Sequence, residues 1–358
     1  MARRKVVVIG GTGYGGAEVL RLCLRHPEVE VVRVTAADNV GKALGEVHLN
    51  LAGASALHFD DAAAWPAERA AAGADVAFLG LPHRISAKVT PGLLAALPAL
   101  RVIDLSGDFR LRDAGAYEHY YEAAHPRPDL LGSFVYGLPE LNRAALRGAA
   151  RIAAPGCFAT AIALGLLPLA RAGLLADGTT IRTVASTGSS GSGVEPKIGT
   201  HHPLRATNLR TYKPLFHQHI PEIEQTLADA GAPPGVTLEF VPVSAPLVRG
   251  IFATSFVEVP DSVTAARVAE AFHAQYDGEL FVRIPAGRHP EVVAVKGTMF
   301  AEVGFELGGR ARGGRRTLVC ISALDNLVKG GGGQAVQDMN IALGFPEPLA
   351  LDDRGLWP

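Results

Sequence analysis

The chain has 358 residues, of which 48% are apolar and 19% charged, and its formal net charge is -1. This composition excludes intrinsic disorder, and the near-zero charge provides no global positive field for holding nucleic acid. The length predicts two domains. Three cysteines are too few, and odd in number, for a disulfide framework, which favours a reducing, cytoplasmic compartment. The apolar run Val6–Ile9 is too short for an export signal, and no apolar stretch reaches the ~18 residues of a membrane span.

Strands and helices alternate through roughly the first 150 residues. Short β-branched or apolar runs predict strands at Lys5–Ile9, Val29–Thr35, Asp75–Leu81 and Arg101–Leu105. Between the first two runs, Ala17–His26 has the pattern of a helix that ends before a proline. This alternation predicts an α/β domain with a doubly wound parallel sheet, in which ligands bind at the carboxyl ends of the strands.

The pattern changes after Cys157. Ala159–Leu175 is almost wholly apolar and predicts a buried helix. Further β-rich runs predict strands at Thr180–Ser186, Val236–Val243, Gly250–Val259 and Thr317–Leu324. Because few helical patterns separate these runs, we expect an α+β domain with a mixed or antiparallel sheet. The basic stretch Gly308–Arg316 contains no aromatic residue, which favours a solvated hairpin turn over a nucleic-acid tail.

A glycine-rich sequence, Gly10-Gly-Thr-Gly-Tyr-Gly-Gly16, joins the first expected strand to the first expected helix. Gly11, Gly13 and Gly16 have the G-x-G-x-x-G spacing. Such glycines allow a tight turn and the close approach of a pyrophosphate, and the following helix N-terminus supplies amide donors. Because the sequence follows a strand and opens a helix, we expect a dinucleotide site rather than a structural turn.

The preference between NAD and NADP depends on the end of the second strand, Val34-Thr-Ala-Ala-Asp38. An acid that binds the ribose 2′-hydroxyl is expected about 20 residues beyond the glycines. The terminal positions of this strand are neutral, and Asp38 comes slightly late. The sequence therefore favours NADP, with the 2′-phosphate met by small polar residues or Lys42.

Cys157 follows Pro155-Gly156 and stands at the start of the apolar helix. A helix N-terminus stabilises a thiolate, so we expect a lowered pKa and a nucleophilic role for this cysteine. Cys23 and Cys320 lie inside a predicted helix and strand, where a cysteine acts as a small hydrophobic residue.

A nucleophilic cysteine needs a neighbouring acid or base, and His217 and His219 are the candidates. Pro221-Glu222 after them starts a helix with an acid in its first turn. A metal site is the competing interpretation, but no compact set of cysteine or carboxylate ligands accompanies the histidines.

Two further features suggest anion binding. Ser186–Gly193 follows a predicted strand, and its small residues expose backbone amides, so we interpret it as a ligand loop rather than a linker. Arg249 lies at the entry of another strand, where it could hold a carboxylate or be an ordinary surface charge.

The sequence resembles the N-acetyl-γ-glutamyl-phosphate reductase family of the aspartate-semialdehyde dehydrogenase superfamily, over almost the whole chain. The motifs that carry the resemblance are, in chain order, Gly10–Gly16, Leu81-Pro-His83, Asp104-Leu-Ser-Gly-Asp-Phe-Arg110, Tyr136-Gly-Leu-Pro-Glu140, Pro155-Gly-Cys157, His217-Gln-His219-Ile-Pro-Glu222 and Leu324-Asp-Asn-Leu-Val-Lys-Gly330.

This resemblance implies that Cys157 attacks an acyl phosphate, expels phosphate and forms a thioester, which NADPH reduces to an aldehyde. It implies His219 as the acid/base, with His217 as the fallback. Glu222 would orient the histidine, and Arg249 would hold the substrate carboxylate. Gln218 replaces the arginine usual in the family, which weakens any inference about an anion contact at that position.

The implied fold is a Rossmann-like doubly wound parallel sheet plus an α+β catalytic and dimerisation domain. Residues 1–154 with 325–358 would bind NADP, and residues 155–324 would carry catalysis and the contacts of a homodimer or homotetramer. Arg110 and His217 join Arg249 as expected substrate contacts, and no metal is expected. The expected NADP(H)-binding residues are Gly10, Thr12, Gly13, Tyr14, Gly15, Gly16, Pro82, Ser186, Gly188 and Asn326.

Two substrates remain open. N-acetyl-γ-glutamyl phosphate, in arginine biosynthesis, is the first expectation. The stretches His201-His202-Pro203 and His125–Leu131 resemble instead the branch that reduces aminoadipyl or glutamyl phosphate on a small acidic carrier protein, in lysine or arginine biosynthesis. Arg205 and Arg210 could face such a carrier or be ordinary surface charges.

Two other classes compete with this interpretation. A Cys-His hydrolase would begin with the same thiol chemistry but needs no dinucleotide, so the glycine loop argues against it. A non-enzymatic NADP-binding redox sensor would use Cys157 as a switch, but no resolving cysteine lies near it in the sequence.

Overall fold

The computed structural model describes residues 2–356. They form two compact units, one comprising the residues up to Pro155 with Gly331–Asp353, the other Gly156–Gly330 with the residues from Arg354 on. A seven-stranded sheet lies at the centre of each unit. Among the described residues, no helix has the length and apolar character needed to cross a membrane.

The sheet of the first unit is entirely parallel, with strand order β3-β2-β1-β4-β5-β7-β6. Its strands are β1 (Arg4–Ile9), β2 (Val29–Ala36), β3 (Phe59–Asp61), β4 (Val76–Leu79), β5 (Arg101–Asp104), β6 (Val135–Tyr136) and β7 (Arg151–Ala153). Its α-helices are α1 (Tyr14–Cys23), α2 (Leu44–Val47), α3 (Ala67–Ala70), α4 (Ser86–Ala96), α5 (Ala114–Tyr121), α6 (Pro139–Leu146) and α11 (Gly333–Leu343).

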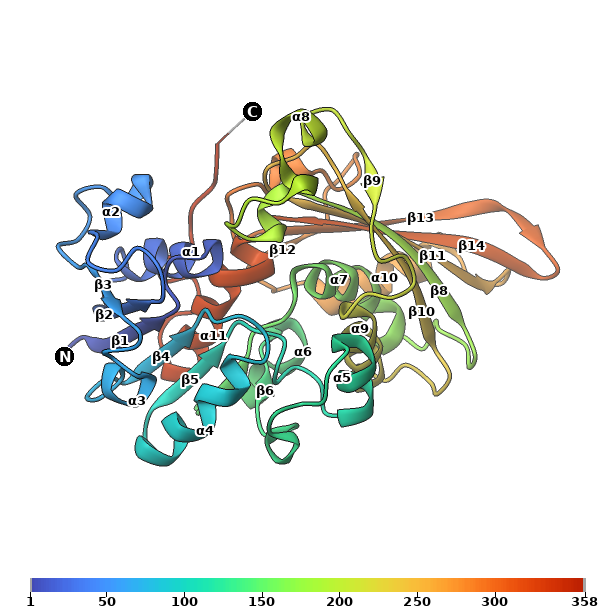
Figure 1. Ribbon diagram of the computed structural model, residues 1–358. Helices are drawn as coiled ribbons and strands as arrows, with labels where there is room; N and C mark the ends of the chain where they lie inside the picture. Colours follow the sequence, from blue (N-terminus) through green and yellow to red (C-terminus); the bar gives the residue numbers. More distant parts are fainter. Residues whose placement is uncertain (1, 357–358) are drawn as a thin grey trace. The chain divides into compact units, whose positions relative to one another are not determined.

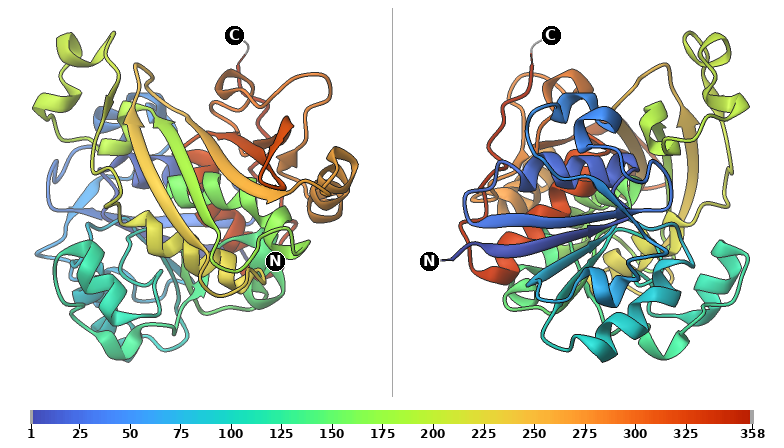
Figure 2. Two further views of the ribbon diagram at one scale, coloured as in Figure 1. Left: turned by 90° about the vertical axis from the view of Figure 1, so that its right-hand side faces the viewer. Right: turned by 60° about the vertical axis from the view of Figure 1, so that its left-hand side comes forward.

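Helices cover both faces of this sheet, with α1 beside α11 on one face and α3 beside α4 on the other (Figure 2). The central strands are therefore buried on both sides and read as continuous apolar runs, as in Val6–Ile9 and Val76–Leu79. Since β1 pairs directly with β4, the segments that follow these two strands emerge side by side at the carboxyl edge of the sheet.

The second unit has a mixed sheet with strand order β12-β13-β14-β11-β8-β10-β9. Its strands are β8 (Thr180–Thr187), β9 (Arg210–Thr211), β10 (Thr237–Ser244), β11 (Ile251–Pro260), β12 (Val282–Arg283), β13 (Ala301–Arg312) and β14 (Arg315–Leu324). Its α-helices are α7 (Cys157–Arg171), α8 (His202–Arg205), α9 (His219–Asp229) and α10 (Ala265–Tyr276).

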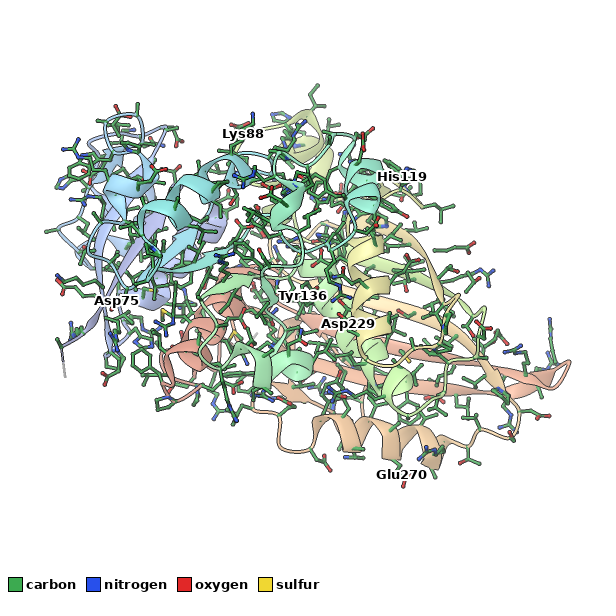
Figure 3. The ribbon with its side chains drawn as sticks, turned by 90° about the horizontal axis from the view of Figure 1, so that it is seen from below. Asp75, Lys88, His119, Tyr136, Asp229 and Glu270 are labelled. Carbon is green, nitrogen blue, oxygen red and sulfur yellow. The ribbon has the colours of Figure 1, made fainter. Side chains whose placement is uncertain are left out.

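Helices α7, α9 and α10 pack on one face of this mixed sheet, and β13 and β14 form its long hairpin (Figure 1). Glu270 marks the outward side of α10, and Asp229 the last residue of α9 (Figure 3). Because helices cover only one face of the sheet, buried and exposed residues alternate along β8 and β11. Val184 and Phe256 are exposed on the uncovered face.

Both parts of the predicted fold class are confirmed, the doubly wound parallel sheet and the α+β unit with a mixed sheet. The hairpin predicted around Gly308–Arg316 is also present, with its turn at Gly313–Gly314. The helix predicted to start near Pro221 is present as α9, whereas α10, which separates β11 from β12, was not predicted. The apolar helix begins at Cys157 and ends at Arg171, earlier at both ends than predicted.

Candidate active site

Cys157 is the first residue of α7, and Gly156 is the N-cap of that helix. The side chain of Cys157 is half-buried, whereas the following helical residues, Phe158–Ala170, are buried. The helix is fixed by its apolar sides, so its N-terminal amides and their partial positive charge are held at the cysteine. This environment favours a thiolate.

Two side chains of α9 converge on Gly156, the residue before Cys157. His219 begins α9, and its Nε2 lies so close that a Cβ atom added to Gly156 would stand 2.2 Å from it. Glu222, one turn further along, accepts the backbone N–H of Gly156 at 2.7 Å. The imidazole and the carboxylate therefore both contact the backbone that carries the cysteine, and both are buried.

His217 packs against the ring of His219, with centroids 4.6 Å apart. Its Nδ1 accepts the backbone N–H of His219 at 3.1 Å, so the neutral ring carries its proton on Nε2. Burial, and secondarily the charge of His219, lowers the pKa of His217 to about 2. The ring of His217 is therefore a neutral hydrogen-bond donor at physiological pH, which leaves His219 as the better candidate for proton transfer.

Tyr212 and Gly330 also lie near Cys157. A Cβ atom added to Gly330 would stand 2.9 Å from the Cβ of Cys157, so the backbone of Gly330 contacts the cysteine. Burial raises the pKa of Tyr212, and the negative charge of the Cys157 thiolate raises it further. The phenol therefore remains protonated and can donate a hydrogen bond beside the sulfur.

Arg249 forms an ion pair with the buried Asp325, with 3.3 Å between Nε and Oδ2. The residues that follow Arg249 and Asp325 also bind each other, since Gly250 donates its N–H to Oδ1 of Asn326 at 2.7 Å. Asn326 in turn donates from Nδ2 to the hydroxyl of Ser190 at 3.0 Å. The Arg249 segment, the 325–330 segment and the loop after β8 are thus joined into one polar network.

The glycine loop of the first unit lies between β1 and α1. Gly10 has a φ of +85°, and a Cβ there would stand 2.6 Å from the carbonyl oxygen of Gly80 at the end of β4, so both conformation and space require glycine. At Gly13, the N-cap of α1, an added Cβ would meet nothing within 4 Å. This open approach to a helix N-terminus fits the pyrophosphate of a dinucleotide.

Beyond β2, Asp38 accepts the hydroxyl of Thr12 at 2.6 Å, which ties this acid to the glycine loop. Asp38 also accepts a hydrogen bond from Asn39, and Lys42 donates to Asn39 at 2.9 Å. One carboxylate and one ammonium therefore lie where the ribose end of a dinucleotide is expected.

Arg110 and the segment after β4 complete the predicted residues of the first unit. The guanidinium of Arg110 donates to the carbonyl oxygens of Ala154 at 2.8 Å and Leu105 at 2.9 Å, a structural role. Pro82 lies three residues beyond the end of β4, and the next residue, His83, accepts the N–H of Gly107 on its Nδ1. A contact between Arg110 or Pro82 and a ligand stays a prediction.

Comparison with family models matches both units of the chain. Residues 5–149 match the NAD-binding domain of semialdehyde dehydrogenases, and residues 157–326 match their dimerisation domain. The chain belongs to the semialdehyde dehydrogenase family. The resemblance found in the sequence is thereby confirmed, and this semialdehyde dehydrogenase is an oxidoreductase that acts on acyl phosphates.

Relatives of this semialdehyde dehydrogenase carry two kinds of name. The LysW-L-2-aminoadipate 6-phosphate reductase of Deinococcus radiodurans is 41% identical, and the N-acetyl-gamma-glutamyl-phosphate reductase of Nitrosospira multiformis is 40% identical; each alignment covers 99% of both chains. A Thermomicrobium roseum protein, provisionally named for the LysW-linked reaction, is 45% identical with the same coverage. These names correspond to the two branches expected from the sequence.

Solved structures share the fold over nearly the full length of the chain. Aspartate semialdehyde dehydrogenase II from Vibrio cholerae has a TM-score of 0.69 at 17% identity and covers 96% of this chain and 99% of its own. The Candida albicans enzyme, solved with NADP, has a TM-score of 0.61 at 14% identity, with coverage of 95% and 98%.

The predicted catalytic residues Cys157, His219 and Glu222 of this semialdehyde dehydrogenase come together around Gly156, with His217 beside them. The bond found for Glu222 comes from the backbone N–H of Gly156, the residue before the cysteine, so its expected role in orienting the histidine stays a prediction. The described residues contain no group of three or more His, Cys, Asp or Glu that could hold a metal ion.

The expected cofactor residues divide between the two units. The glycine loop and Pro82 belong to the first, whereas Ser186, Gly188 and Asn326 belong to the second. Gly188 packs closely on the backbone of Val248, where a Cβ would stand 2.5 Å from a carbonyl oxygen. A structural reason thus accounts for glycine there, and a cofactor contact at Ser186, Gly188 or Asn326 stays a prediction.

Sequence reasoning missed three residues of the site: Gly156, Tyr212 and Gly330. Gly156 and Gly330 stand within motifs that pointed to this family, but the contact of each with another segment is visible only in the fold. Tyr212 lies a few residues before the His217–Glu222 motif and outside it, where no pattern singles out one aromatic residue.

Proposed function

We propose that this protein reduces an acyl phosphate to the corresponding semialdehyde, using NADPH and a thioester on Cys157. The observation that carries this proposal is the convergence of His219 and Glu222 on Gly156, directly beside Cys157 at the N-terminus of α7. A thiolate held at a helix N-terminus next to an imidazole is the arrangement that covalent acyl transfer needs.

The Cys157 sulfur attacks the acyl carbon, and the bond from that carbon to the phosphate oxygen breaks, releasing phosphate and leaving a thioester. When bound, the reduced nicotinamide supplies the hydride that the thioester carbon accepts. His219 gives a proton to the carbonyl oxygen during this reduction. It takes the proton back as the carbon–sulfur bond breaks, which releases the aldehyde and restores the thiolate.

Glu222 acts on the nucleophile through the backbone. Its carboxylate accepts the N–H of Gly156 and fixes the position at which α7 begins. His217 stays neutral and presents Nε2–H, a donor suited to an oxygen of the substrate. Arg249, already paired with Asp325, is the candidate to hold the substrate carboxylate.

For the substrate, we favour a carrier-linked aminoadipyl or glutamyl phosphate over N-acetyl-γ-glutamyl phosphate, the first expectation from sequence. The 194–215 segment supports this choice. It carries Lys197, Arg210 and Lys213 against the single acid Glu195, and its apolar side chains Ile198, Leu204 and Leu209 are exposed. A basic and apolar surface of this kind suits a small acidic carrier protein.

We propose NADP(H) as the cofactor because the end of β2 is neutral up to Ala37, and Lys42 lies near the ribose position. For assembly, we propose a homodimer or homotetramer formed through the open face of the mixed sheet. Val184 and Phe256 are 44% and 42% exposed there. Apolar side chains on a flat sheet face are typical of subunit interfaces.

The test is phosphate-dependent reduction of NADP⁺ by the semialdehyde, offered as the free N-acetyl compound and as the carrier-linked compound. We expect turnover by the natural protein with the carrier-linked aldehyde and almost none by Cys157→Ser. Unchanged turnover in Cys157→Ser would refute the thioester. Faster turnover of the free compound would instead identify N-acetyl-γ-glutamyl phosphate as the substrate. His219→Asn should lower turnover more than His217→Asn, and the reverse order would exchange their roles.

A further inference from the structure

Arg205, the last residue of α8, is a buried arginine whose hydrogen-bonding capacity is largely unused. Its side chain is only 7% exposed. Nη2 donates to the backbone carbonyl of Thr187 at 3.1 Å, but Nε and Nη1 are buried with no hydrogen-bond partner in the described part of the chain. Buried guanidinium N–H groups normally have hydrogen-bond acceptors, so the two open donors of Arg205 are suited to an acceptor from outside the chain.

The charge of Arg205 is also uncompensated. No carboxylate of the described residues forms an ion pair with it, in contrast to Arg249, whose partner is Asp325. Burial lowers the pKa of Arg205; of the two titratable side chains that act on it, Tyr212 raises the pKa and Arg210 lowers it further. A buried cation without a counter-ion is costly unless an anion joins it.

Two observations relate Arg205 to the candidate active site. Tyr212 is affected electrostatically by both Arg205 and Cys157, and its ring lies 6.1 Å from that of His217. Thr187, which holds Arg205, ends β8 and leads directly into the Ser189–Ser192 turn, where Ser190 receives the Asn326 hydrogen bond. Arg205 and Cys157 thus both act on Tyr212, although α8 lies at the periphery of its unit (Figure 1).

We propose that Arg205 binds an oxyanion of the substrate, either its carboxylate or its phosphate group, and so places the acyl carbon at Cys157. This proposal rests on the proposed acyl-phosphate function and extends it by a second substrate-binding arginine. An incoming oxyanion would satisfy the open N–H donors and compensate the charge at once, which is the geometry of charge-assisted recognition.

The first test compares alkylation of Cys157 by iodoacetate with alkylation by iodoacetamide, two reagents that differ in charge. Cys23 and Cys320 are each 1% exposed, so the reaction reports Cys157, with Cys157→Ser as the blank. We expect Arg205→Gln to lower the iodoacetate-to-iodoacetamide rate ratio about fivefold. Arg205→Lys should keep most of the ratio, and Arg171→Gln, which removes an exposed charge at the other end of α7, should keep all of it.

An unchanged iodoacetamide rate in Arg205→Gln shows that the fold and the thiolate are intact. If the ratio also stays unchanged, the proposal is overturned; if the iodoacetamide rate itself collapses, Arg205 is a structural residue and the proposal is equally wrong. Neither result depends on turnover, so this test can fail while Cys157→Ser still supports the proposed function.

The second test identifies which oxyanion Arg205 binds, by protection of Cys157 against iodoacetamide. Inorganic phosphate and N-acetylglutamate serve as the two probes. Protection by phosphate that is lost in Arg205→Gln assigns the site to the leaving group, and the same loss with N-acetylglutamate assigns it to the carboxylate. If each probe protects Arg205→Gln as well as the natural protein, Arg205 binds neither group and the proposal is rejected.

Discussion

Gly156→Ala adds one methyl group at the point where His219 and Glu222 approach Cys157. The added Cβ would stand 2.2 Å from Nε2 of His219, so the imidazole must retreat by about 1.2 Å to reach the 3.4 Å at which ordinary contact begins. The backbone is not the obstacle, because φ and ψ of -71° and 147° suit alanine, and the N–H that binds Glu222 is kept.

Displacement of a catalytic group by about 1 Å costs roughly 100-fold in rate, or about 2.7 kcal/mol in activation free energy. We therefore expect Gly156→Ala to lower kcat about 100-fold while destabilising the fold by no more than about 1 kcal/mol, the usual cost of alanine at an N-cap. The assay is steady-state reduction of NADP⁺ by the semialdehyde with phosphate present, accompanied by urea unfolding of each protein.

Gly165→Ala is the matched control, because it makes the same change in the same helix where the added Cβ would only reach ordinary contact, 3.6 Å from the Ser322 hydroxyl. It should keep full activity. A double variant sharpens the test, since Gly156→Ala should cost almost nothing further once His219→Ala has removed the ring. A fully folded Gly156→Ala that retains kcat within about threefold would refute the reasoning.

Three further predictions concern other parts of the molecule. The pKa of His217 is lowered from 6.5 to about 2, so below about pH 6.5 the unfolded chain binds a proton on this ring and the folded chain does not. The free energy of unfolding should therefore fall by roughly 2 kcal/mol between about pH 6.5 and pH 5. This contribution to the fall should disappear in His217→Asn. Urea titrations at both pH values measure it, and an equal fall in both proteins would contradict it. Lys42→Gln should raise KM for NADPH about tenfold and leave KM for NADH unchanged; a natural preference for NADH would instead mean that Asp38 binds a ribose hydroxyl. Phe256→Asp should convert the assembly to monomers in sedimentation, with Glu270→Gln on the outward side of α10 as the control, and an unchanged assembly would exclude this face as the interface.

Local patterns predicted the parts of the fold that depend on short stretches of sequence. The run Val6–Ile9 and the glycines after it are sufficient to predict a buried parallel strand and its turn, and Gly308–Arg316 is sufficient to predict a hairpin. Helix α10 was missed because its stretch was read as a connection within a β-rich region, although Thr264 caps it and its apolar residues have helical spacing.

The sequence predicted which residues make up the candidate site, but it did not predict the contacts between them. Cys157 and His219 could be singled out because their neighbours in sequence have recognisable chemistry. The role of Gly156 depends on how closely α9 approaches α7, a distance that no local pattern encodes. Arg205 shows the same limit, since its sequence neighbours resemble those of the exposed Arg210, and only the fold buries one and exposes the other.

The central claim, a thioester on Cys157, is tested most directly by the mass of the protein after mixing with the acyl phosphate in the absence of any nicotinamide cofactor. We predict release of phosphate together with a mass increase equal to the acyl group, located on the peptide that contains Cys157 and absent from Cys157→Ser. Phosphate release without acylation of that peptide, or acylation at another residue, would contradict the account.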